Sequence, residues 1–197
     1  MTRLGVVLLA AGRSERFGAN KLLADFRGKP MICRALEALS ALTACRKCVV
    51  AGSERIAVLA QEYGFDVIYN HEPELGQSHS IRLGVGAMQD LDAVLLMAAD
   101  QPSLTGQSLV RLSKAFCACE KGIACLCDET HMGNPAVFSK AYFPQLLRLE
   151  GDRGAKAILR SNPDALLIVS CVYRGELADA DTPDALKEIE SGLQSIE

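Results

Sequence analysis

The chain has 197 residues, 49% of them hydrophobic, and a formal net charge of −3, which suits one ordinary domain around a single core, residues 1–197. Its apolar runs are shorter than the ~18 residues of a membrane span and no signal-peptide core follows the N-terminus, so we expect a cytoplasmic protein without a membrane partner. Residues 1–35 hold seven of the 21 Lys and Arg but two of the 24 Asp and Glu, and this local excess favours a compact polyanion as ligand over a nucleic acid.

The first predicted strand leads into a loop rich in cations. An apolar run from Leu4 to Ala10 indicates a buried strand, which stops at Ala11-Gly12. The loop then gathers Arg13, Arg16 and Lys21 among glycines and other small residues. Backbone that approaches an anion needs glycine and a triphosphate needs several cations, so we interpret this segment as a phosphate-binding loop. It matches neither the dinucleotide GxGxxG pattern nor the GxxxxGK[ST] pattern.

Helical and extended patterns alternate along the rest of the chain. This order predicts parallel strand pairing and an α/β fold, a Rossmann-like three-layer α/β/α arrangement with a mostly parallel central sheet. The predicted helices cover about 30–43, 53–63, 78–88, 105–119, 142–149, 155–161 and 184–194, and the further predicted strands cover 49–51, 65–69, 92–99, 122–127, 136–138 and 166–169.

The most apolar of these strands, residues 92–99, ends on Asp100. A fully buried central strand has this composition, and ligands of α/β folds bind at the carboxyl ends of the strands. Topology therefore places Asp100 at the binding edge. The alternative is a turn or capping residue ahead of Pro102.

The eight cysteines fall within predicted strands and helices of a chain without a predicted signal. We interpret them as reduced, mostly buried thiols. A zinc site remains the alternative, because zinc is commonly held by two close cysteine pairs brought together. The pairs available for such a site are Cys45/Cys48, Cys117/Cys119 and Cys125/Cys127.

Two segments together carry a resemblance to a known family. LAAGRSERFGANKLL (residues 9–23) with LMAADQP (residues 96–102) resembles the nucleotidyltransferases that attach a nucleotide to molybdopterin. LAAG with RFG resembles the CTP-using cytidylyltransferases of that family, whereas LAGG with RMG marks the GTP-using guanylyltransferases. Further segments resemble family landmarks in the expected order: GQSHSIRLG (76–84), GNPAVF (133–138), GDRGAKAIL (151–159) and DADTPDAL (179–186).

The resemblance implies a nucleotidyltransferase fold and the transfer of CMP from CTP to the terminal phosphate of molybdenum cofactor (molybdopterin), giving molybdopterin cytosine dinucleotide and pyrophosphate. It implies Mg2+ (or Mn2+) as cofactor. It also implies a nucleotide-binding half, about residues 1–105, and an acceptor-binding half, about residues 106–197. Because the attacking phosphate monoester is already charged, such an enzyme needs cations and a metal ion rather than a catalytic triad.

Catalytic roles fall by resemblance on Lys21, Arg16 and Asp100, with Lys21 at the α-phosphate. Asp100 and Asp181 are the expected metal ligands, and Asp179 is the alternative to Asp181. A surface lysine and helix caps are the structural alternatives for these residues.

The expected binding residues form two groups. Residues of the first loop and of the segment at 76–80 should contact the nucleotide, and two glycine-containing segments should contact the acceptor; ordinary turns and caps are the alternatives. The nucleotide group is Ala10, Ala11, Gly12, Arg13, Lys21, Gln77, Ser78 and Ser80, with Arg82 nearby, and the acceptor group is Gly133, Asn134, Pro135, Asp152 and Arg153.

Two other functions stay open. One is a related nucleotidyltransferase that uses GTP or another phosphate acceptor. The other is a non-catalytic protein that binds the cofactor and delivers it to a molybdenum hydroxylase apoenzyme. The presence of Asp100 and Lys21 argues against a loss of catalysis, although delivery could coexist with transfer.

Overall fold

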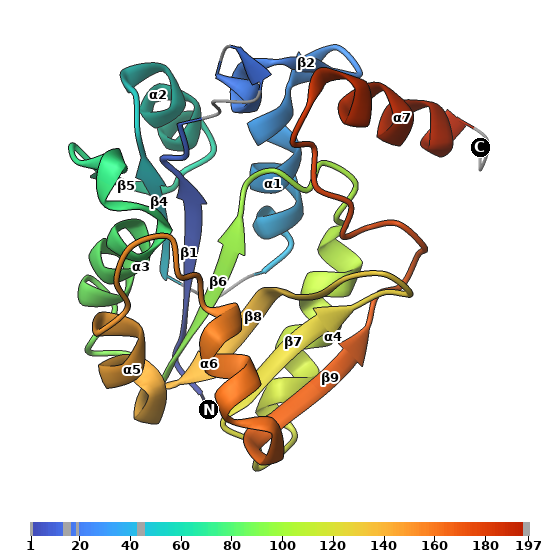
Figure 1. Ribbon diagram of the computed structural model, residues 1–197. Helices are drawn as coiled ribbons and strands as arrows, with labels where there is room; N and C mark the ends of the chain where they lie inside the picture. Colours follow the sequence, from blue (N-terminus) through green and yellow to red (C-terminus); the bar gives the residue numbers. More distant parts are fainter. Residues whose placement is uncertain (1, 14–16, 19, 43–45, 195–197) are drawn as a thin grey trace.

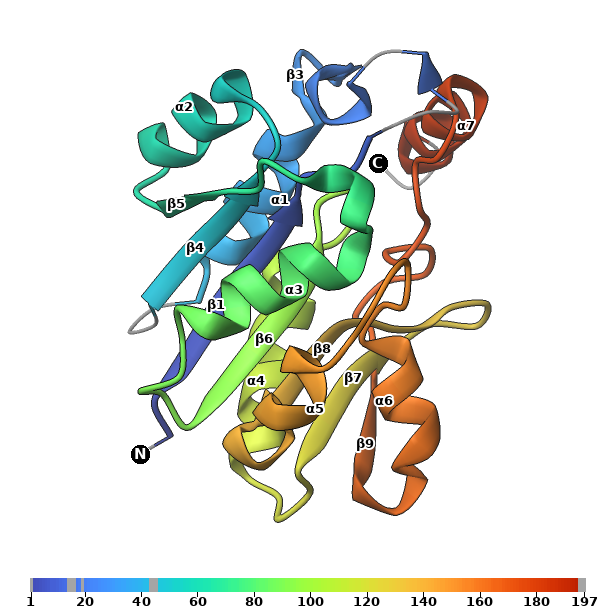
Figure 2. The same ribbon diagram turned by 60° about the vertical axis from the view of Figure 1, so that its left-hand side comes forward.

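The computed structural model describes residues 2–13, 17–18, 20–42 and 46–194, with side chains as far as residue 192. Helices cover both faces of one central sheet (Figure 1, Figure 2). Within the described residues this sheet has seven strands. The three-layer α/β/α arrangement confirms the predicted fold class. No helix in the described ranges is long and apolar enough to cross a bilayer.

The helices and strands follow the predicted alternation closely. The strands are β1 (Leu4–Ala10), β2 (Asp25–Phe26), β3 (Lys29–Pro30), β4 (Arg46–Ala51), β5 (Asp66–Tyr69), β6 (Ala93–Ala98), β7 (Ile123–Cys127), β8 (Met132–Ser139) and β9 (Leu166–Ser170). The α-helices are α1 (Met31–Ser40), α2 (Glu54–Glu62), α3 (Gln77–Gly86), α4 (Gly106–Cys117), α5 (Phe143–Leu147), α6 (Lys156–Ser161) and α7 (Pro183–Gln194).

The sheet is parallel except at one strand. β1 pairs in parallel with β4 on one side and with β6 on the other, so that Leu9 lies beside Val50 and Ala98. β4 pairs with β5, and β7 with β9, also in parallel. β8 runs antiparallel between β6 and β7. The carboxyl ends of β1 and β6 therefore meet at one edge of the sheet, as the sequence predicted for their loops.

Two local predictions were wrong in extent, and one small element was missed. β8 begins at Met132, although Gly133 and Pro135 predicted a loop as far as residue 135. The helix predicted over 142–149 is a 3-10 turn followed by the short helix α5. The small hairpin of β2 and β3 was not predicted, because two-residue strands have no detectable periodicity.

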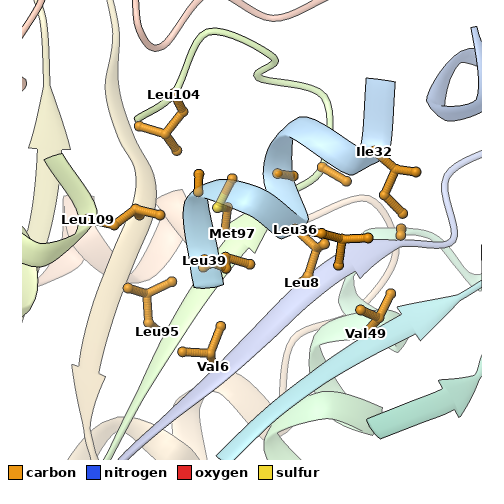
Figure 3. Close-up of a cluster of buried hydrophobic side chains, with 14 of the residues drawn as sticks. Val6, Leu8, Ile32, Leu36, Leu39, Val49, Leu95, Met97, Leu104 and Leu109 are labelled. Carbon is orange, nitrogen blue, oxygen red and sulfur yellow. The ribbon is translucent and has the colours of Figure 1, made fainter. Parts of the chain in front are cut away.

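Side chains alternate between the two faces of the sheet and feed two cores. On one face Val6, Leu8, Leu95 and Met97 pack against helices, and the intervening residues pack on the opposite face. Figure 3 shows the first core, where residues of α1 lie over β1 and β6. Helices α1, α2 and α4 contribute to this core, and α3, α5 and α6 contribute to the other.

Helix α3 lies unusually close to the central strand. A Cβ added at Gly84 would sit 2.3 Å from Cγ1 of Val7. Only a residue without a side chain fits this contact. The close approach fixes α3 against β1, and α3 begins at Gln77 beside the edge where β1 and β6 end.

Candidate active site

The phosphate-loop prediction and the Asp100 prediction meet at one edge of the sheet. Ala11 and Gly12 directly follow β1, and Asp100 follows β6, the strand beside it. A 3-10 turn at Lys21–Leu23 closes the loop after β1. The side-chain Oδ1 of Asn20 caps this turn by accepting a hydrogen bond from the N–H of Leu22 at 3.2 Å. The cap fixes the backbone from which Lys21 extends.

Lys21 joins two carboxylates that lie far apart in the sequence. Its Nζ donates to Oδ2 of Asp100 and to Oδ1 of Asp181, both at 2.8 Å. The Lys21 side chain is 13% exposed, and those of Asp100 and Asp181 are 22% and 48% exposed. Burial alone would lower the pKa of Lys21, but the two carboxylates outweigh it and the net pKa is raised above 10.5. The lysine is therefore charged at neutral pH.

Asp100 has unused capacity to bind a cation. Its Oδ1 is buried and has no hydrogen-bond partner among the described residues, while its Oδ2 accepts from Lys21. A buried, unpaired carboxylate oxygen is costly unless a cation or donor reaches it. The Lys21 ammonium already shows that a cation fits between Asp100 and Asp181. Carboxylate oxygens are hard ligands, so this pair suits a hard divalent ion.

A segment without regular structure, residues 171–182, brings Asp181 to this edge. Its anchor is Glu176, a carboxylate that is 1% exposed. Glu176 accepts hydrogen bonds from the N–H and Oγ1 of Thr105 and from Oγ of Ser108, all at 2.8 Å, and from the N–H of Tyr173 at 2.7 Å. The segment is thereby tied to the start of α4.

Further bonds hold the end of this segment against β6. The N–H of Ala180 donates to the backbone oxygen of Asp100 at 2.9 Å. The buried Gln101 donates from Nε2 to the backbone oxygen of Leu177 and to Oδ1 of Asp179, both at 3.1 Å. Withdrawal from water and the charge of Asp100 raise the pKa of Asp179 above 3.8. Asp181, and not Asp179, shares Lys21 with Asp100.

Two adjoining cavities open at this edge. The first has a volume of about 400 Å3 and the second about 300 Å3. Asp100, Gln77 and Asp152 line both cavities, together with Leu9 and Ala98. The shared wall means that ligands in the two cavities would meet beside Asp100.

Most of the predicted nucleotide residues line the first cavity. Ala11, Gly12, Arg13, Lys21, Gln77 and Ser80 do so, and Asp181 also lines it. Ala10 is buried in the sheet and does not line either cavity. Arg16 lies outside the described residues.

Ser78 is buried at the start of α3 rather than in a cavity wall. Its N–H donates to the backbone oxygen of Gly151 at 3.2 Å, and its Oγ accepts from Nη1 of Arg82 at 3.3 Å. The same Nη1 donates to the backbone oxygen of Leu149. Ser78 and Arg82 therefore join α3 to the segment that follows α5.

The predicted acceptor residues divide between the second cavity and other places. Gly133, Asn134 and Asp152 line the second cavity. Oδ1 of Asn134 accepts from the N–H of Ala98 at 3.0 Å, which holds β8 at the end of β6. Pro135 is buried and lines neither cavity, and Arg153 is exposed outside both.

Three residues of the edge had no role in the sequence prediction. Lys156 lines the second cavity with Asp179, and Gln101 orients Asp179 from below the surface. Glu176 anchors the segment that carries both aspartates. Lys156 lies within the GDRGAKAIL segment already noted, three residues after Arg153. The segment was thus expected near the acceptor, but its cation was expected to be Arg153 rather than Lys156. Gln101 likewise lies within the LMAADQP segment already noted, whereas Glu176 lies in none of the noted segments. The contacts of both residues join distant parts of the chain, so the sequence did not indicate their roles.

The cysteines do not form a metal site in the described part of the chain. Seven of them are described, and all seven are free. No group of three or more His, Cys, Asp or Glu residues gathers there as a metal site. Burial raises the pKa of Cys48 to about 12 and that of Cys125 to about 11, so these thiols stay protonated. Cys45, of the predicted CxxC pair, lies outside the described residues.

The relatives that resemble this chain in sequence include the following two proteins. The purine catabolism protein PucB of Bacillus subtilis is 28% identical over 192 residues, which cover 90% of this chain and 91% of that protein. A probable molybdenum cofactor guanylyltransferase of Pyrococcus horikoshii is 32% identical over 124 residues, 63% of this chain and 62% of that protein.

A solved structure and a family model complete the comparison. The structure of Rv0371C from Mycobacterium tuberculosis H37Rv in complex with manganese has a TM-score of 0.75 and 23% identity, covering 96% of this chain and 98% of that one. At this identity the likeness shows the fold alone. The family model of the MobA-like NTP transferase domain matches residues 6–166. The chain therefore belongs to the MobA-like NTP transferase family.

Proposed function

We propose that this nucleotidyltransferase moves CMP from CTP to the terminal phosphate of molybdenum cofactor and releases pyrophosphate. The observation that carries the proposal is the pair of adjoining cavities that share Asp100. One cavity presents the cations Arg13 and Lys21. The other is large enough for a second ligand beside it. This arrangement suits a reaction in which two phosphorylated substrates meet end to end.

The transfer needs little covalent help from the protein. An oxygen of the acceptor phosphate forms a bond to the α-phosphorus of CTP, and the bond from that phosphorus to the bridging oxygen breaks. Pyrophosphate leaves with the electron pair. Lys21 and Arg13 would hold and neutralise the triphosphate, and the backbone at Ala11 and Gly12 would lie along it. Because the acceptor oxygen is already ionised, no side chain has to remove a proton from it.

Asp100 and Asp181 would hold a divalent metal ion, Mg2+ or Mn2+. The buried, partnerless Oδ1 of Asp100 and the cation held between the two carboxylates support this assignment. When bound, the metal would neutralise charge on the phosphate oxygens. Two protein carboxylates leave the other ligand positions to phosphate and water, which suits a metal that arrives with the nucleotide.

The choice of CTP rests on Ala11. This residue is 6% exposed and lines the first cavity. Its Cα lies 3.0 Å from the position that a Cβ at Gly52 would take, so the loops after β1 and β4 are in contact behind it. The methyl group of Ala11 would occupy room in the first cavity that a glycine at this position would leave to the base. A smaller pyrimidine fits such a site better than a purine.

Molybdopterin as acceptor rests on the family and on the relative named as a molybdenum cofactor guanylyltransferase. In the proposed division, residues 1–105 bind the nucleotide and residues 106–197 bind the acceptor. Asp152 and Asp181 cross this division, because both line the nucleotide cavity. A molybdenum hydroxylase that receives the product is the partner we propose.

The test is to incubate the purified protein with Mg2+, molybdenum cofactor and each of the four nucleoside triphosphates, and to follow pyrophosphate release and product mass. We expect release with CTP and formation of molybdopterin cytosine dinucleotide. Asp100→Asn should lower the rate at least 100-fold, since it removes a charged ligand from the site. Ala11→Gly should raise the rate with GTP relative to CTP. Release with GTP alone would refute the choice of nucleotide.

A protein that only delivers the cofactor would bind it without releasing pyrophosphate from any triphosphate. The same assay therefore separates delivery from transfer. Transfer to a different phosphorylated acceptor, with CTP still required, would refute only the choice of acceptor.

A further inference from the structure

We infer that Lys156 binds the phosphate group of the acceptor. This inference rests on the proposed function and deepens it by naming the residue that recognises the attacking group. Lys156 is the first residue of α6 and lines the second cavity. The sequence had pointed instead to Arg153, three residues earlier, which lines neither cavity.

The charges that line the second cavity demand a cation. Three carboxylates line it, those of Asp100, Asp152 and Asp179. A phosphate monoester carries close to two negative charges at neutral pH, and carboxylates alone would repel it. Among the described residues that line this cavity, Lys156 is the one cation. Arg13 and Lys21 line the first cavity, where the triphosphate needs them.

The ammonium of Lys156 is not committed to a structural ion pair. No ion pair or hydrogen bond joins its side chain to any residue in the described ranges. By contrast, Lys21 lies 2.8 Å from two carboxylates. Lys156 is close enough for its charge to act on Asp179, yet no contact within hydrogen-bond distance ties the two together. Its charge therefore remains available to a ligand.

Packing directs the Lys156 side chain across the cavity wall. A Cβ added at Gly133 would sit 3.2 Å from Cγ and 3.5 Å from Cε of Lys156, and 3.2 Å from Cδ2 of Leu159. The methylene stem thus lies over the backbone of Gly133, whose φ of +105° also favours glycine. Gly133 therefore does more than make a turn, since it leaves room for the stem of the lysine.

The position fits the geometry of the transfer. Asp100 belongs to both cavities, and the acceptor phosphate must approach the α-phosphate beside it. Lys21 would bind the triphosphate, and Lys156 would bind the phosphate of the acceptor. The two lysines would then keep two anionic groups in contact that otherwise repel each other.

The experiment compares wild-type protein with Lys156→Gln and with Arg153→Gln as the matched control. Each variant removes one positive charge from the same segment, and only the first removes it from a cavity. Initial rates are measured with Mg2+ while molybdopterin and CTP are varied in turn. A charge-assisted bond to a phosphate corresponds to about a 10- to 100-fold change in binding. We expect the KM for molybdopterin to rise by this factor in Lys156→Gln, while the KM for CTP changes less than about 2-fold.

A second measurement tests the phosphate itself. Molybdopterin treated with phosphatase is added as an inhibitor of the wild-type protein and of both variants. We expect Lys156→Gln to bind the dephosphorylated compound as the wild type does, because the contact that it lacks is to the phosphate. Lys156→Arg should restore most of the affinity for the intact acceptor. Melting temperatures by circular dichroism show whether each variant is folded.

The outcomes are distinct. An unchanged molybdopterin KM in Lys156→Gln, an equal rise in Arg153→Gln, or equal loss of the two acceptor forms would overturn the role of Lys156 while the proposed function stands. Absence of any transfer to molybdopterin by the wild-type protein would overturn the proposed function, and the role of Lys156 with it.

Discussion

Replacement of Lys21 by Met should make the protein bind a divalent metal ion more tightly in the absence of nucleotide. In the structure the Lys21 ammonium lies between Asp100 and Asp181, the two carboxylates proposed to hold the metal. A metal ion that binds there has to displace the ammonium. Met has a similar length and no charge, so the variant leaves the carboxylate pair without this competitor.

The size of the effect follows from the two ion pairs. At 2.8 Å, unit charges attract by about 6 kcal/mol with an effective dielectric constant of 20, before the cost of desolvation. Desolvation removes most of this, and hydrogen bonds to charged groups contribute about 1.5–3 kcal/mol net. The Asp181 side chain is 48% exposed, so the ion pair between Lys21 and Asp181 contributes at the low end of this energy range. Displacing the ammonium should therefore weaken metal binding in the wild type by about 10- to 100-fold.

Mn2+ binding is measured by electron paramagnetic resonance or calorimetry without nucleotide, at pH 7. The pKa of Lys21 is raised above 10.5, so its stabilising charge is fully present below pH 10.5 and is lost only as the pH rises through the raised value. We expect Lys21→Met to bind Mn2+ 10- to 100-fold more tightly than the wild type, and its melting temperature to rise more on Mn2+ addition.

Lys29→Met is the control, because Lys29 pairs with Glu37 and lines neither cavity. This variant should bind Mn2+ as the wild type does. Equal Mn2+ affinity in the wild type and in Lys21→Met would refute the proposal that lysine and metal compete for the same carboxylates.

Three further predictions concern stability, each checked by urea denaturation. Gly84→Ala should lower the free energy of unfolding by about 1–3 kcal/mol, because the added Cβ would collide with Val7. Gly86→Ala on the same helix has open space for the Cβ, so this variant should raise the free energy of unfolding by up to about 1 kcal/mol. Leu36→Ala removes a fully buried side chain of the first core and should cost about 2–5 kcal/mol. Burial would raise the pKa of Asp128, but backbone N–H groups of its own loop hold that pKa below 3.8. Its stabilisation therefore exists above pH 3.8 and is lost as the pH falls through the lowered value. Asp128→Asn should cost about 1–2 kcal/mol of unfolding free energy at pH 7, and this cost should shrink as the pH falls below 3.8.

The sequence predicted the order and type of most elements because their side chains alternate clearly. Leu4–Ala10 was predicted with its observed bounds, since the apolar run is continuous and a glycine follows it. β8 was shortened in the prediction, because Gly133 and Pro135 are atypical of strands. The missed part is held by the pairing of Met132 with Cys127 of β7 and by the hydrogen bond from Ala98 to Asn134. At this strand, tertiary contacts override the local conformational preference of the sequence.

The site was predictable where residues directly follow strands and less so where they lie in irregular segments. Asp100 follows a buried strand, and topology alone placed it beside the loop after β1. Asp181 was expected ahead of Asp179 by resemblance alone, because residues 171–182 have no regular structure whose periodicity would separate the two aspartates. In the structure Gln101 donates a hydrogen bond to Asp179, and Glu176 anchors the segment that carries both aspartates. Both contacts join distant parts of the chain, so local sequence patterns do not predict them.

The segment anchored by Glu176 makes the completion of the cation site depend on residues near the end of the sequence. The loop after β1 and Asp100, by contrast, follow two strands that pair directly with each other. Asp181 arrives 81 residues after Asp100 and beyond the family-matched region 6–166. A nascent chain, or a fragment cut at the end of that region, would present the phosphate loop and Asp100 without the second carboxylate. The complete pair of carboxylates therefore requires the chain as far as residue 181, held in place by the Glu176 anchor.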